Sequence, residues 1–89
     1  KSPPFCALVR VRTDDDPTAV MTEIARRFGD ADPFQGASAI FGKADLLIEL
    51  AGDTLAAVSG PVLDVIRGTP GVVWTETSFA YSEPWRTEP

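Results

Sequence analysis

Four segments of the chain are predicted to be β-strands, and the clearest of them show the period of two in apolar and polar residues that is typical of strands. The four segments are residues 5–12, 34–41, 46–50 and 72–81. The clearest is 46–50, where Leu46, Ile48 and Leu50 share one strongly apolar face. Segment 34–41 consists mostly of small residues, which offer little surface for packing, so we expect this strand at a sheet edge.

Apolar residues at helical spacing follow the first strand. Val20, Ile24 and Phe28 recur every four residues and predict a helix with one buried face. Residues 13–17, Thr-Asp-Asp-Asp-Pro, combine N-cap residues, negative charge and a proline suited to the first helical turn. This acidic run is interpreted as a helix cap rather than a metal site, because no other cluster of ligands is visible. Gly29 is expected to end the helix.

A second helical face spans residues 55–66, and Asp53 is placed to cap its start. Gly60 and Pro61 interrupt this face. The proline lacks an N–H, and its ring crowds the carbonyl four residues back. We therefore expect a kink here, or a division into two short pieces. The Gly-Thr-Pro-Gly run at residues 68–71 ends the helix and turns the chain.

The order strand, helix, strand, strand, helix, strand predicts a ferredoxin-like βαββαβ fold of the α+β class. With right-handed crossovers, the four strands form an antiparallel sheet with both helices on one face. Strand 72–81 carries Val and Trp on one face and Thr, Phe and Tyr on the other. We expect both faces of the sheet to be covered, one by helices and one by a partner subunit. The chain divides into an N-terminal extension (1–4), one domain (5–81) and a C-terminal tail (82–89).

Composition and charge narrow the classes of function. A chain of 89 residues with 44% apolar content fits one small domain that cannot cover both sheet faces alone, which favours self-association. The net charge of −5 and the scattered basic residues argue against direct binding to nucleic acid or to an anionic membrane. Cys6 is the single cysteine, so no intrachain disulfide forms. With no signal peptide and no membrane-spanning run, a cytoplasmic location is expected.

The chain offers few catalytic groups. It contains no His and no Asn, and no triad spacing, phosphate-binding glycine loop or metal motif is present. Cys6 is interpreted as a packing residue, because no partner base accompanies it. We therefore predict a protein that is not an enzyme and needs no metal or cofactor.

The turn at residues 41–45 is the candidate ligand site. Gly42 allows the backbone to reverse and leaves amide N–H groups available for an anion. These amides and Lys43 would hold a carboxylate, and the Asp45 carboxylate would hold an ammonium. Two hydroxyls would add to the site if the last strand lies nearby: Thr75 and Thr77. The alternative is that Gly42 forms a simple hairpin turn and Asp45 is a strand-end residue.

Three stretches, in their order and spacing, are similar to a known family. They read ALVRV at residues 7–11, FGKADLLI at 41–48 and TPGVVWTET at 69–77. Together they resemble the C-terminal effector-binding domain of the Lrp/AsnC regulators, also called the RAM domain. The likeness covers residues 5–81.

The resemblance implies a protomer whose sheet packs against that of a second protomer in a dimeric α/β barrel. It also implies that dimers assemble into a ring of four dimers, an octamer, with small effectors, commonly amino acids, held between dimers. If the ligand-contacting positions of the family's motif are transferred to this sequence, Gly42 and Asp45 would contact the effector, with Thr75 and Thr77 beside them. Lys43 occupies a position where relatives often have other residues. Family members usually carry a helix-turn-helix domain ahead of this one, so the chain looks like a stand-alone form that does not bind operator DNA by itself.

Three hypotheses of function follow. In the first, the protein is an effector-sensing and oligomerisation module that also joins full-length Lrp/AsnC regulators. In the second, it is an enzyme of the dimeric α/β barrel group, such as a cofactor-independent monooxygenase, since a fold alone does not decide function. In the third, it is an assembly domain without a ligand.

Overall fold

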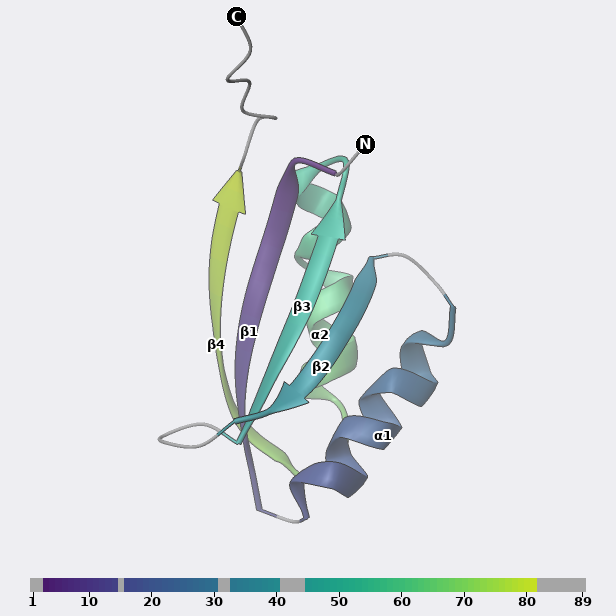
Figure 1. Ribbon diagram of the computed structural model, residues 1–89, viewed down its shortest axis with the longest axis vertical. Coiled ribbons are helices and arrows are strands. Elements are labelled where there is room, and N and C mark those ends of the chain that lie inside the picture. Colours follow the sequence, from purple (N-terminus) through teal and green to yellow (C-terminus); the bar gives the residue numbers. More distant parts are fainter. Residues whose placement is uncertain (1–2, 15, 31–32, 41–44, 82–89) are drawn as a thin grey trace, which may run out of the picture.

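The computed structural model describes residues 3–14, 16–30, 33–40 and 45–81, and its elements follow the predicted order (Figure 1). These elements are β1 (Phe5–Thr13), α1 (Pro17–Phe28), β2 (Phe34–Ala39), β3 (Leu46–Gly52), the 3-10 helix η1 (Leu55–Val58), α2 (Pro61–Arg67) and β4 (Val72–Tyr81). The strands form one antiparallel sheet in the order β2-β3-β1-β4. This arrangement confirms the predicted ferredoxin-like α+β fold, with β2 at an edge.

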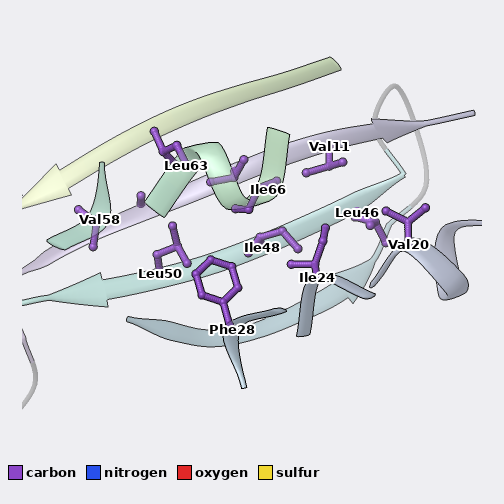
Figure 2. Packing of buried hydrophobic residues seen from close by; sticks show 12 residues of the cluster. Val11, Val20, Ile24, Phe28, Leu46, Ile48, Leu50, Val58, Leu63 and Ile66 are labelled. Carbon is purple, nitrogen blue, oxygen red and sulfur yellow. The ribbon is translucent and has the colours of Figure 1, made fainter. Parts of the chain in front are cut away.

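The hydrophobic core lies between one face of the sheet and the helices (Figure 2). Three pairs of β1 and β3 residues form the sheet side of the core: Ala7 with Leu50, Val9 with Ile48, and Val11 with Leu46. Ile24 and Phe28 of α1 and Leu63 and Ile66 of α2 pack onto this same face. Both helices therefore cover one side of the sheet, as the alternation of apolar residues predicted.

The ends of α1 match the sequence signals. The side chain of Asp16 accepts a hydrogen bond of 3.2 Å from the Thr18 N–H, and Pro17 takes the first helical position. At the other end, the N–H of Gly29 donates to the carbonyl of Ala25 at 2.9 Å. The acidic run before α1 thus contains the N-cap, as predicted.

The second helical segment is divided, as expected at the Gly60-Pro61 pair. The 3-10 helix η1 ends at Val58, and α2 begins at Pro61, which follows Gly60 with a φ of 59°. The prediction that Asp53 caps this segment is wrong. Thr54 is the N-cap, because it is the residue directly before η1, and its hydroxyl accepts a hydrogen bond of 3.2 Å from the N–H of Ala57.

The open face, defined here as the side of the sheet opposite the helices, carries both charged and apolar side chains. Leu8 lies near the middle of β1 and is 37% exposed. Beside it, Arg10 contacts Glu76 of β4 at 3.9 Å. The guanidinium of Arg12 stacks over the ring of Trp74 at 5.2 Å from the ring centroid. Because each residue of the pair Arg10–Glu76 is about half exposed, this ion pair contributes little to stability.

Candidate functional site

Asp45 stands directly before β3 and beside the end of β1. Its N–H donates to the carbonyl of Val11 at 2.8 Å, which continues the pairing of β1 with β3. Its carboxylate atom Oδ2 accepts two hydrogen bonds from Thr13, one of 2.8 Å from the backbone N–H and one of 3.0 Å from the hydroxyl. The side chain is therefore held in one orientation by groups from the neighbouring strand.

These contacts favour the charged form of the Asp45 carboxylate, so its pKa lies below the ordinary value. The backbone N–H of Thr13 lowers the pKa of Asp45 most, its hydroxyl lowers it further, and the positive charge of Arg12 adds to the effect. Burial acts in the opposite direction but does not prevail. Asp45 is thus a fixed negative charge at neutral pH. A carboxylate has about four lone-pair sites, so the two bonds to Oδ2 leave acceptor capacity for a ligand.

Thr75 and Thr77 lie on β4, both half-buried, and point to the helix side of the sheet. The register pairs Thr75 with Val11, and Val11 with Leu46 on its other side. β1 therefore separates Thr75 from the start of β3 by two strand spacings, about 10 Å. One protomer brings the two threonines together on one face and does not bring either into contact with Asp45.

Two of the predicted site residues, Gly42 and Lys43, lie outside the described residues. Their predicted roles in binding a carboxylate stay predictions. The described chain resumes at Asp45, whose carbonyl accepts a hydrogen bond of 3.0 Å from the N–H of Ile40. This hydrogen bond extends the antiparallel pairing of β2 with β3 by one residue pair beyond Ala39 and Leu46.

A small hollow of about 240 Å³ lies beside Thr75. It is bounded by Arg67 at the end of α2 and by Val72, Trp74 and Thr75 at the start of β4. Of these residues, Arg67 carries the group best suited to bind a carboxylate, a guanidinium. Arg67 also contacts Asp64 at 3.4 Å, but both side chains are more than half exposed, so this pair is weak.

Two residues near these candidate sites were not predicted from the sequence as site residues, Thr13 and Arg67. Thr13 was interpreted as part of the cap of α1, and its contact with Asp45 depends on the register between β1 and β3. Arg67, the last residue of α2, was not singled out from the sequence. Only the turn after α2, which brings β4 back beside this helix, places Arg67 near Thr75. No local pattern signals either contact.

Within the described ranges, no group of three or more acidic or Cys side chains is placed to hold a metal ion. In the same part of the chain, neither helix has the length and apolar content needed to cross a membrane.

Solved structures share this fold. The hypothetical protein PHS023 from Pyrococcus horikoshii is 22% identical, with 89% of this chain and 92% of that chain covered and a TM-score of 0.72. TTHA0845 from Thermus thermophilus is 22% identical, with 92% and 99% covered and a TM-score of 0.74.

A third structure is the transcriptional regulator NMB0573 from Neisseria meningitidis in complex with L-Met. It is 23% identical, with 93% of this chain and 53% of that chain covered and a TM-score of 0.67. The chain thus spans about half the length of this regulator. Because all three structures are less than 25% identical to this chain, the similarities establish the shared fold alone.

The comparison with curated protein sequences gave no significant match. The sequence profile of the Lrp/AsnC ligand binding domain matches residues 6–89, which is nearly the whole chain. The chain therefore belongs to the Lrp/AsnC ligand-binding domain family.

Proposed function

We propose that this protein senses a small amino acid-like effector and serves as an oligomerisation module of the Lrp/AsnC regulator type. The family match over residues 6–89 supports a ligand-binding role. The solved complex of a structurally similar regulator with L-Met supports an amino acid as the class of ligand. The role is regulatory rather than catalytic, in keeping with the few catalytic groups in the chain.

The observation that carries this proposal is the fixed, ionised carboxylate of Asp45. Two hydrogen bonds from Thr13 hold it directly before β3 and lower its pKa, which favours the charged form. A preoriented carboxylate binds an ammonium group without first losing conformational entropy. In this proposal Asp45 binds the α-ammonium of the effector, and the preceding turn with Gly42 and Lys43 binds its carboxylate.

The site is completed by a second copy of the chain. Thr75 and Thr77 are too far from Asp45 to contact the same amino acid within one protomer, since β1 lies between them. In the proposed assembly, protomers pair through the open face, and dimers join in a ring so that Asp45 of one dimer faces Thr75 of another. Arg67, beside Thr75, supplies a further partner for the effector's carboxylate.

The proposed location is the cytoplasm, where amino acid effectors are available. The negative charge of the chain disfavours direct binding to DNA. In this proposal, any effect on transcription therefore passes through full-length Lrp/AsnC regulators that assemble with this domain.

Calorimetric titration with each of the twenty amino acids tests the proposal. We expect at least one to bind, and we expect Asp45→Asn to weaken that binding about tenfold or more, because a charge-assisted hydrogen bond is lost. Asp30→Asn is the matched control, since it removes one exposed carboxylate after the end of α1. Light scattering shows whether the variants keep the oligomer. Heat that is unchanged in Asp45→Asn, or no heat with any amino acid, contradicts the proposal.

A further inference from the structure

A second hollow, of about 380 Å³, lies at the far end of β3 from Asp45. It is bounded by Pro33 directly before β2, by Gly52 at the end of β3, by Ala57 of η1 and by Val62 of α2. Gly52 follows Asp45 by seven positions of extended chain, which corresponds to about 23 Å. Its volume falls at the lower end of the range of small-molecule pockets, so a small metabolite fits its size.

The walls of this second hollow are fixed by close packing and a backbone hydrogen bond. A Cβ atom on Gly52 would lie 2.6 Å from the Cβ of Ala57, so only glycine lets η1 approach the strand this closely. On the other side, the carbonyl of Pro33 accepts a hydrogen bond of 3.0 Å from the N–H of Ala51. The hollow is therefore formed in advance of any ligand, which lowers the entropic cost of binding.

The polar groups of the second hollow are rich in hydrogen-bond acceptors. Asp53 contributes a carboxylate, and the Thr54 hydroxyl accepts from the N–H of Ala57 at 3.2 Å while keeping its own hydrogen to donate. The Gln35 side chain donates its N–H to the carbonyl of Pro33 at 3.4 Å, and its amide oxygen is a further acceptor. Among the described residues that line this hollow, none is a Lys or an Arg. Its chemistry favours a cation over an anion.

We propose that the second hollow binds a small primary ammonium compound with a short apolar chain. The ammonium contacts the carboxylate of Asp53, and the amide oxygen of Gln35 is its second acceptor. The apolar chain packs against Pro33, Ala57 and Val62. This site is separate from the one that includes Asp45, and it does not depend on the function proposed above.

Titration of the ¹⁵N-labelled protein with n-butylammonium chloride, followed by NMR, tests this inference. We expect saturable shifts of the amide signals of Gly52, Thr54 and Ala57. In Asp53→Asn we expect the dissociation constant for butylammonium to rise about tenfold, because the neutral amide loses the charge-assisted contact. Asp30→Asn, which removes an exposed carboxylate after α1, is again the matched control and should bind as the unchanged protein does.

Two further measurements separate this site from the effector site. Asp45→Asn should leave the butylammonium shifts at Gly52 and Ala57 unchanged, whether or not an amino acid binds at Asp45. Uncharged n-butanol should shift the same amide signals, with a dissociation constant larger than that of butylammonium. The inference is overturned by shifts that centre on Thr13 and Leu46 instead, by the absence of saturable shifts, or by equal affinity in Asp53→Asn.

Discussion

The carboxylate of Asp45 has a structural role as well as a proposed ligand role. Its two hydrogen bonds from Thr13 connect the beginning of β3 with the end of β1, where the pairing of β1 with β4 is irregular between Arg12 and Thr13. Asp45 therefore has the structural role of a strand-end residue, which was the alternative interpretation of this position. Because the same contacts fix its direction and its charge, the two roles support each other.

Thr13→Val separates the contributions of the two hydrogen bonds to the pKa of Asp45. The substitution removes the hydroxyl and keeps the backbone N–H, which lowers the pKa more. We expect the pKa of Asp45 to rise in this variant and to stay below its ordinary value. A ¹³C NMR titration of the side-chain carboxyl measures this.

Thr22→Val is the matched control for Thr13→Val. Its hydroxyl donates to the carbonyl of Thr18 on an exposed part of α1, away from Asp45. The pKa of Asp45 should not change in this variant. A pKa of Asp45 that is unchanged in Thr13→Val would show that the hydroxyl does not contribute.

Gly52→Ala tests how closely η1 packs on β3. An added Cβ would lie 2.6 Å from the Cβ of Ala57, so the 3-10 helix must shift. We expect a loss of about 1–3 kcal/mol in the free energy of unfolding, as is typical of overpacking, measured by urea denaturation. Gly36→Ala is the control, because no atom lies within 4 Å of its added Cβ, and we expect a change within about 0.5 kcal/mol. Equal effects of the two substitutions would contradict this account.

At the scale of elements, what the sequence predicted correctly depends on local interactions. Asp16 and Gly29 bound α1 because a cap and a terminating glycine act within a few residues of each other. The break at Gly60 follows from the same kind of local chemistry. The cap at Asp53 was misplaced by one residue, since Thr54 and Asp53 are both good N-caps and the exact start of η1 depends on its packing against β3.

An ion-pair network links α1 with the end of α2. Glu23 accepts hydrogen bonds from Arg26 and Arg27, at 2.7 and 2.8 Å, and Arg27 also donates to the carbonyl of Gly68 at 3.4 Å. The bond from Arg26, and then that from Arg27, lowers the pKa of Glu23 from 4.5 to about 2. Glu23 therefore contributes stability that is complete above about pH 4.5 and disappears as the pH falls toward 2.

Glu23→Gln tests this pH dependence. We expect the melting temperature of the variant to lie below that of the unchanged protein at pH 7, with the difference shrinking between about pH 4.5 and 2. Added salt should also reduce the difference, because the three side chains are partly exposed. Differential scanning calorimetry at several pH values between 2 and 7 measures this difference in melting temperature. A difference that persists unchanged at pH 2 would show that Glu23 stabilises the protein by packing instead.

At the scale of the whole molecule, the sheet has two unlike sides. The helices cover one face of the sheet (Figure 1). That face contains Val9 and Ile48, whereas the open face carries Leu8 and Trp74 beside charged side chains. The sequence predicted this asymmetry through the alternation of residues. It did not predict that β1 separates Asp45 from Thr75, because strand order is set by long-range pairing. This separation is the physical reason to expect that a second copy completes the site.

Leu8→Lys tests whether the open face is the surface through which two protomers pair. Leu8 lies on a central strand, opposite Glu49 of β3, and is 37% exposed, so a lysine there is tolerated in one protomer. Between two stacked sheets its charge would have to lose its hydration, which costs free energy even beside a carboxylate. We expect light scattering at micromolar concentration to give a dimer or larger assembly for the unchanged protein and a single protomer for Leu8→Lys. Circular dichroism should show that the variant stays folded.

Leu55→Lys is the matched control for Leu8→Lys. Leu55 is 51% exposed and belongs to η1, on the helix side of the sheet. The same substitution there should leave the assembly intact, since this side does not enter the proposed dimer. If Leu55→Lys rather than Leu8→Lys dissociates the assembly, the protomers pair through the helices. A mass equal to one protomer for the unchanged protein would contradict the proposed dimer. It would also contradict the effector site, which requires a second copy of the chain.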